Sequence, residues 1–459
     1  MMERESRAFV RRFDVIELAV MLATVVQWLV LATLAGVIIG TGTSLFLHGL
    51  FLATDRTAGI PLWLQMTMLA VGGLLNGLLL HYGYQGNAGG LKDSVFAAVN
   101  TQSGRLPFRT ILIKPVAAIL TLASGGSAGK EGPCSHIGAS LASAIGQVLR
   151  LNTELRLRLV ACGVSAGFAS VFGTPIAGAI YGVEMLAIGR IRHDFIFPAI
   201  VAGVASYQVS LFWGVPYQYY RVPAVPEVSE FLFLKTAGLG VICGVVALIF
   251  VEMVHRSERF FSRVQHRFHV WPPLMPLGGG LLLALLILVI PADYLGLSLP
   301  VMDRALAGEP MPYLGFVWKS LFVAITLGSG FYGGRVTPQF VIGATAGSAF
   351  AGLCGMNAAL GAAVGLAGVV AASSNTPIAA ILMGVELFGG SVSMLYIAGA
   401  AIAAYLVIGH RSIYREQRLA YAKSSWMRVR PETAVDAEKA RLAYGLLRWW
   451  GRRQMRSKP

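Results

Sequence analysis

Charged residues are scarce in this sequence. They make up 13% of its 459 residues, whereas 56% are hydrophobic, and an ordinary soluble domain carries roughly 25% charged residues. Water is therefore not the main solvent of this chain. The composition excludes an ordinary water-soluble domain and predicts a protein built inside a membrane.

Cysteine is also rare. The four cysteines do not pair at the spacing of metal ligands, and each lies among apolar or small residues; they are Cys134, Cys162, Cys243 and Cys354. We interpret them as packing residues, which excludes a disulfide framework. We expect no metal and no cofactor.

Enzyme motifs are missing or incomplete. The segment Ser124–Glu131 resembles the phosphate-binding pattern G-x-x-x-x-G-K-[ST], but Ser124 replaces the first glycine and Glu131 replaces the residue that would hold magnesium. Neither a His-Glu-x-x-His motif nor a nucleophile elbow is present. A membrane-embedded lipid-modifying enzyme, the remote alternative, would need clustered carboxylates or a nucleophile with its base. We expect no enzymatic activity.

Apolar runs, by contrast, recur from end to end. Several are long enough to cross the ~30 Å hydrocarbon core, which takes about 20 helical residues. Other runs are shorter and broken by Gly, Pro and Ser, and we expect tilted or partial crossings there, because irregular backbone survives at membrane depth only where protein or a cavity surrounds it. The long runs are Val15–Val37, Leu62–Leu80, Phe231–Val251, Pro276–Ile290 and Ile397–Ile408, and the shorter ones are Ile111–Leu122, Ile137–Val148 and Pro377–Phe388.

The formal net charge of +15 comes largely from the two ends of the chain. Residues 411–459 hold 13 Lys or Arg against 4 Asp or Glu, and the N-terminal stretch contains Arg4, Arg7, Arg11 and Arg12. The positive-inside rule places both termini in the cytoplasm. We expect the basic tail to contact anionic membrane lipids and expect no nucleic-acid partner.

The sequence contains an internal repeat. Thr174-Pro-Ile-Ala177 recurs 202 residues later as Thr376-Pro-Ile-Ala379, and Ile137-Gly-Ala-Ser140 recurs 205 residues later as Ile342-Gly-Ala-Thr345. Two matches in the same order at nearly equal offsets indicate duplicated halves. In transporters built from repeats, the substrate site commonly lies near the bilayer midplane, where interrupted helices of both halves meet.

Glycine-rich loops lead into helices in both halves. They span Ser124–His136, Gly328–Pro338 and, earlier in the first half, Gln85–Asp93. Amides exposed at a helix start carry about half a positive charge and can bind an anion without a full cation. Halide conduction needs weak, multiple contacts that let the ion leave again. The loops therefore predict a pathway for small anions.

Glu131 is the unusual residue of the first loop. An ionisable side chain at membrane depth costs roughly 2.5–3.5 kcal/mol on insertion scales unless it is paired, solvated or protonated. Our hypothesis is that the carboxylate occupies the anion's place and leaves it when protonated, which would couple protons to anion passage. The alternative is a carboxylate that pairs with Lys130 or caps the helix start.

The sequence Gly129-Lys-Glu-Gly-Pro133, followed by His136-Ile-Gly138, resembles the second signature of the CLC family of chloride channels and chloride/proton antiporters. The resemblance extends from about residue 20 to Tyr414. It implies a gating role for Glu131. Gly409-His-Arg-Ser-Ile-Tyr414 is similar to the start of the last family helix, which implies that the Tyr414 hydroxyl contacts the central anion. Without the resemblance, Tyr414 would be interpreted as an aromatic residue at the membrane interface.

The second-half loop resembles another family signature, Gly-x-Phe-x-Pro. It reads Gly334-Arg-Val-Thr-Pro338, so Val336 stands where Phe is usual. The resemblance implies that the amides of Arg335 and Val336 face the anion. The full set of anion-binding residues implied in this way is Gly90, Gly132, Arg335, Val336 and Tyr414.

Two departures from the family pattern bear on the mechanism. The family's first signature, Gly-Ser-Gly-Ile-Pro, contains a serine that contacts the anion. Counting back from Glu131 without gaps places Gly90 at the position of this serine, and the loss of its hydroxyl affects anion selectivity. In many proton-coupled members two adjacent glutamates follow the Thr-Pro-Ile-Ala segment, and here the pair reads Glu184-Met185. Glu184 and Glu386 are open to two interpretations, a structural pairing or a proton path, and Met185 cannot carry a proton.

The resemblance implies an all-α, polytopic membrane protein with two inverted halves, tilted and broken helices, and a homodimeric assembly with one pathway per subunit. We expect chloride/proton exchange in the plasma (inner) membrane, with a passive chloride channel as the alternative. Retained Glu131 favours exchange and Met185 favours a channel. Fluoride is a minor candidate. The predicted division is a basic N-terminus at 1–14, repeats at 15–215 and 216–410, and the start of the last pore helix with a basic cytoplasmic tail at 411–459.

Overall fold

The computed structural model describes residues 2–83, 95–100, 102–223, 229–438 and 441–442, and within them it confirms an all-α fold. Five helices are long and apolar enough to cross a membrane. The helices are α1 Met2–Arg56, α2 Leu62–Gly83, α3 Val95–Asn100, α4 Thr110–Ala123, α5 Glu131–Val148, α6 Thr153–Phe172, α7 Pro175–Glu184, α8 His193–Phe212, α9 Glu230–Phe268, α10 Leu274–Leu286, α11 Leu299–Leu306, α12 Gly315–Gly328, α13 Val336–Phe350, α14 Ala358–Ser374, α15 Pro377–Phe388 and α16 Met394–Val407, with 3₁₀ turns at Ala292–Tyr294 and Ala351–Cys354.

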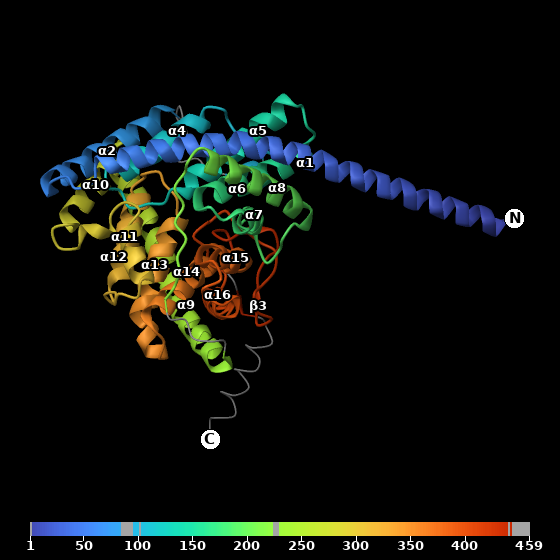
Figure 1. The fold of residues 1–459 in the computed structure, drawn as a ribbon. Coiled ribbons are helices and arrows are strands. Elements are labelled where there is room, and N and C mark those ends of the chain that lie inside the picture. The colour runs from blue at the N-terminus through green and yellow to red at the C-terminus, as the bar shows by residue number, and fades with distance from the viewer. Residues whose placement is uncertain (1, 84–94, 101, 224–228, 439–440, 443–459) are drawn as a thin grey trace, which may run out of the picture.

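The helices differ in length from the apolar runs that predicted them. Helix α1 has 55 residues and α9 has 39, so both continue into polar sequence, and Figure 1 shows α1 projecting from the helical bundle as a rod. Helix α10 ends at Leu286, before the predicted Ile290, and the chain continues in turns up to Pro291. The division at 14/15, 215/216 and 410/411 stays a prediction, and its first boundary falls inside α1.

Reciprocal contacts relate the two halves. The amide of Gly129 donates to the carbonyl of Gly334 at 2.9 Å, and the amide of Gly334 donates back to the carbonyl of Gly129 at 2.8 Å. The carboxylate of Glu184 accepts from the start of α15, and the carboxylate of Glu386 accepts from the start of α7. Such exchanged pairs are what a two-fold axis produces, in agreement with the prediction of two inverted halves.

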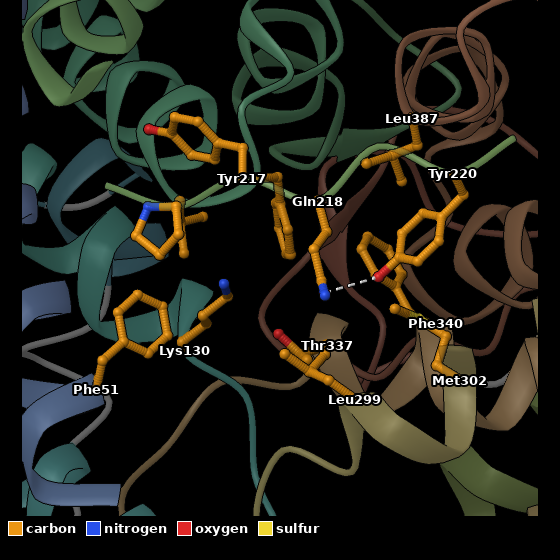
Figure 2. Close-up of a pocket in the computed structure, with 13 residues that line it drawn as sticks. Phe51, Lys130, Tyr217, Gln218, Tyr220, Leu299, Met302, Thr337, Phe340 and Leu387 are labelled. Carbon is orange, nitrogen blue, oxygen red and sulfur yellow. Dashed lines mark hydrogen bonds between the residues drawn. The ribbon is translucent and has the colours of Figure 1, made fainter. Parts of the chain in front are cut away.

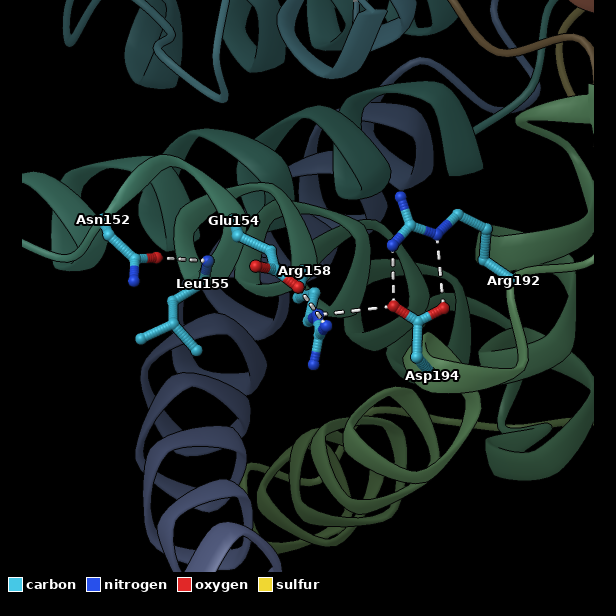
Figure 3. A network of polar contacts seen from close by, with 6 residues as sticks. All are labelled: Asn152, Glu154, Leu155, Arg158, Arg192 and Asp194. Atoms are coloured by element: carbon cyan, nitrogen blue, oxygen red, sulfur yellow. Dashed lines mark hydrogen bonds and ion pairs between the residues drawn. The ribbon is translucent and has the colours of Figure 1, made fainter.

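Helix α6 begins with a cap that its sequence makes possible. The side chain of Asn152 accepts the amide of Leu155 at 2.9 Å, which satisfies one of the unpaired donors of a helix start. One turn further on, Arg158 pairs with Glu154 and reaches Asp194 of α8 at 3.3 Å (Figure 3). The cap and the ion pairs fix α6 against α8 at one end of the first half.

The chain after α16 differs from the expected helix start. The described residues beyond Gly409 form turns and short strands. At their start, the side chain of Ser412 accepts a hydrogen bond from the amide of Tyr414, which competes with helical hydrogen bonds there. Strand β2 (Arg418–Leu419) pairs in parallel with β1 (Ala187–Ile188) and antiparallel with β4 (Thr433–Ala434). A second pair joins β3 (Met427–Arg428) to β5 (Arg441–Leu442). We call residues 415–438 the tail segment.

Candidate functional site

Glu131 is the first residue of α5, and its side chain is 1% exposed. Its carboxylate crosses to the start of α13 in the other half. It accepts the amide of Val336 at 2.5 Å, the amide of Thr337 at 3.2 Å and the Thr337 hydroxyl at 2.6 Å. The carboxylate therefore occupies the helix start at which the second loop was predicted to hold an anion.

The two glycine-rich loops bring Glu131 to this place. The paired backbones of Gly129 and Gly334 join the loops directly in front of α5 and α13. A Cβ atom at either glycine would collide with the carboxylate oxygens of Glu131. Only glycine leaves room at both positions, so the loop composition follows from the close approach of backbone and carboxylate.

The alternative interpretation, in which Glu131 pairs with Lys130 or caps the helix start, agrees with the structure in part. The carboxylate does cap a helix, but that helix is α13 of the second half and not its own α5. Lys130 points elsewhere, with its Nζ 5.2 Å from the centre of the Phe51 ring. The amides that donate to this carboxylate are those of Val336 and Thr337. The implied anion-binding role of the Arg335 and Val336 amides stays a prediction.

A cavity of about 690 Å³ lies on the tail side of Glu131, and we call it the tail-side cavity. Five of the residues singled out in the sequence line it together: Glu131, Gly132, Met185, Arg335 and Tyr414. The tail segment contributes to its wall through Ala434, Asp436 and Ala437. Of the other two anion-binding candidates, Val336 does not line this cavity and Gly90 lies outside the described residues.

A second cavity, of about 230 Å³, shares Thr337 with the site (Figure 2). Its walls are mainly apolar and aromatic, and the Lys130 side chain turns toward it. Glu131 lines the tail-side cavity and its hydrogen-bond partner Thr337 lines the second one, so their contact joins a wall of one cavity to a wall of the other.

Charged groups that the sequence reading missed surround the tail-side cavity. The carboxylate of Glu258 in α9 lies 3.2 Å from Arg335 and 2.9 Å from Arg415. Arg335 also donates to the carbonyl of Ile413 at 2.6 Å. This cluster fixes the backbone on either side of Tyr414, and its only sequence signal was the continuation of α9 into polar residues.

The first loop rests on a buried cation. Lys319 of α12 is fully buried, and its Nζ donates to Ser127 Oγ, Ser298 Oγ and the Gly296 carbonyl, each at 2.8 Å. A buried ammonium needs such acceptors because desolvation is costly. Ser127 belongs to the Glu131 loop, so Lys319 holds that loop against the second half.

Glu184 has a clear structural position. Its carboxylate accepts the amides of Ile378 at 3.1 Å and Ala379 at 2.8 Å, so it caps α15 as Glu386 caps α7. Met185, its neighbour, lines the tail-side cavity, whereas Glu184 does not. The geometry gives Glu184 a structural pairing, and its place on a proton path stays a prediction.

The tail segment is anchored by Lys423. Its Nζ donates to Asn375 Oδ1 at 2.6 Å and to the Tyr405 carbonyl at 2.8 Å. Burial lowers the pKa of Lys423 to about 6, because an ammonium loses its hydration there. Among the residues that the structure describes, no group of three or more His, Cys, Asp or Glu side chains could hold a metal ion.

A family model and a curated relative match most of this chain. The family model described as "Voltage gated chloride channel" matches residues 72–409. A relative from Pseudomonas syringae pv. tomato, "Chloride/fluoride channel protein", is 35% identical over 411 residues, covering 88% of this chain and 89% of its own.

Two solved structures are also similar. A CLC-type fluoride/proton antiporter has a TM-score of 0.78 at 29% identity, covering 86% of this chain and 98% of its own. A slow cyanobacterial Cl⁻/H⁺ antiporter has a TM-score of 0.67 at 22% identity, covering 83% of this chain and 94% of its own. The second likeness concerns the fold alone.

Proposed function

Because this chain belongs to the family of voltage-gated chloride channels, and so transports anions across a membrane, we propose that it exchanges a small halide for protons. The observation that carries this proposal is the Glu131 carboxylate bound to the start of α13, where a halide would otherwise bind. The Glu131 carboxylate can then respond both to protons and to the halide.

The exchange starts with Glu131 ionised and in place. Three hydrogen bonds to a charged acceptor stabilise this state. A proton that arrives through the tail-side cavity neutralises the carboxylate and weakens these bonds, and the side chain leaves. The amides of Val336 and Thr337 and the Thr337 hydroxyl are then open to a halide, with the Tyr414 hydroxyl at the cavity.

The missing inner glutamate does not prevent this exchange. Met185 cannot carry a proton, but Glu131 itself lines the tail-side cavity. That cavity, at about 690 Å³, is far larger than the roughly 30 Å³ that one water occupies. Water can therefore bring protons to Glu131 without a second carboxylate, so Met185 is no obstacle to exchange.

The comparisons add fluoride to chloride as a candidate halide. The sequence placed chloride first and fluoride as minor. The relative at 35% identity is named for chloride and fluoride, and the antiporter structure at 29% identity is named for fluoride. Fluoride needs strong donors to replace its hydration shell, and the site supplies two amides and a hydroxyl. We propose that the site carries fluoride as well as chloride.

We further propose the setting of this exchange. The family resemblance supports a homodimer with one pathway per subunit. The basic ends support a plasma (inner) membrane location with both termini in the cytoplasm. The tail-side cavity would then open toward the cytoplasm.

The test is halide efflux from liposomes that contain the purified protein, with simultaneous recording of halide and pH, for fluoride and for chloride. Proton uptake driven against its gradient by halide exit is the expected result. Halide flux without proton movement would establish the passive channel instead. No flux of either halide would refute the proposed function.

Glu184→Ala and Glu386→Ala make a matched pair, because each removes one of two reciprocal helix caps. Each loss should lower the free energy of unfolding by about 1–2 kcal/mol. We expect both variants to keep the wild-type number of protons moved per halide, measured in the same liposomes. A lower proton number in Glu184→Ala alone would place Glu184 on the proton path.

A further inference from the structure

A chain of hydroxyl groups leads away from Tyr414 into the protein. The Tyr414 and Tyr181 hydroxyl oxygens lie 3.1 Å apart. The Tyr181 hydroxyl lies 2.9 Å from Ser374 Oγ, and Ser374 Oγ lies 3.0 Å from Gln339 Oε1. Tyr181, Ser374 and Gln339 are each fully buried, so their partners are fixed by the packing of α7, α14 and α13.

The direction of this chain is set at its inner end. Gln339 Oε1 can only accept, so the Ser374 hydroxyl donates to it. Ser374 must then accept the proton of Tyr181. The proton between the two tyrosines consequently belongs to Tyr414, whose hydroxyl donates inward and leaves only oxygen lone pairs for the tail-side cavity.

The amide of Gln339 is not locked in this orientation. Its Nε2 is buried and has no hydrogen-bond partner among the described residues, although buried donors are nearly always paired. If the amide turned over, Nε2 would donate to Ser374, Ser374 to Tyr181, and Tyr181 to Tyr414. The Tyr414 hydroxyl would then offer its proton to the cavity.

We propose that Gln339 is a positioning residue that sets whether Tyr414 presents lone pairs or a proton to the halide path. With Glu131 bound at α13, as in this structure, Tyr414 donates inward. A halide needs donors, so its arrival favours the reversed chain. For this reversal the amide of Gln339 must turn over. The free energy that the turn requires weakens halide binding, because the resting state has the opposite orientation.

This inference rests on the proposed function, because it concerns how tightly the same site holds a halide. Gln339→Met removes the acceptor that pulls the chain inward and keeps the side-chain volume. Tyr181→Phe removes the hydroxyl that accepts the hydrogen bond of Tyr414. Both changes free the Tyr414 proton for the halide.

We expect each variant to bind fluoride or chloride about fivefold more tightly than wild type, the effect of roughly one net hydrogen bond. The measurements are titration calorimetry of the purified protein and the halide KM in liposomes. Tyr396→Phe is the matched control, because Tyr396 is fully buried and its hydroxyl accepts the amide of Ser229. It should leave halide affinity unchanged.

The outcomes distinguish a failure of the role of Gln339 from a failure of the proposed function. Equal or weaker halide binding in both variants, with flux retained, would overturn the role of Gln339 and leave the exchanger intact. A merely structural role predicts weaker binding and slower flux. If one variant fails to fold, the other decides. Absence of halide flux in wild type would overturn the proposed function instead.

Discussion

Glu131→Gln is expected to abolish proton movement and to leave halide flux in place. Glutamine keeps the size of the side chain but carries no charge, so it resembles the protonated carboxylate at every pH. Hydrogen bonds to charged acceptors contribute about 1.5–3 kcal/mol each, against about 1 kcal/mol for neutral ones. Because three such bonds hold Glu131 at α13, the neutral side chain should lose the site to halides.

The size of this effect follows from those bonds. A loss of about 3 kcal/mol shifts the equilibrium between a filled and an open site by more than a hundredfold. We expect proton flux to fall below a tenth of the wild-type value and halide flux to become independent of pH. The assay is the liposome recording of halide and pH described above, repeated at several external pH values.

Glu154→Gln is the matched control for this substitution. Glu154 makes its contact with Arg158 at the protein surface, and its side chain is 67% exposed. It should behave as wild type in coupling and in pH dependence. Unchanged pH dependence in Glu131→Gln would remove Glu131 from the gating role, whatever the halide flux.

The sequence was sufficient to single out Glu131 but not to predict the residues that it contacts. The loop around Glu131 and its repeat near Gly334 stood out because glycine, an apolar surrounding and one carboxylate are local features. That the carboxylate would bond to the hydroxyl of Thr337 depends on a contact between residues 206 apart. No local pattern encodes such a contact, although the repeat offset indicated which loops would meet.

The same reasoning explains what was missed elsewhere. Tyr181 lies in an apolar helix, where a tyrosine is most simply a packing residue, and only its 3.1 Å approach to Tyr414 gives its hydroxyl a role. Glu184 was open between two interpretations because its partners, the amides of α15, belong to backbone and leave no trace in residue type. The expected helix start at Tyr414 failed on a local competitor, the side chain of Ser412.

Gly138→Ala is expected to have the largest effect on stability. Gly138 lies in α5 where the helix crosses α6, and an added Cβ would collide with the carbonyl oxygen of Gly163. Both sides of this contact are backbone, so the two helices must separate. Overpacking of this kind costs typically 1–3 kcal/mol, and we expect the free energy of unfolding, measured in detergent, to fall by about 3 kcal/mol.

Gly238→Ala in α9 is the matched control, because no atom lies within 4 Å of its added Cβ. Alanine is the better helix former by about 1 kcal/mol, so this variant should be as stable as wild type or more stable. Equal losses in both variants would contradict the role of close backbone packing.

The two variants should differ in transport as well, because α5 carries Glu131 at its first residue. A shift of α5 that accommodates one methyl group lengthens the three hydrogen bonds that hold the carboxylate at α13, so Gly138→Ala should lose proton coupling while any protein that remains folded still conducts halide.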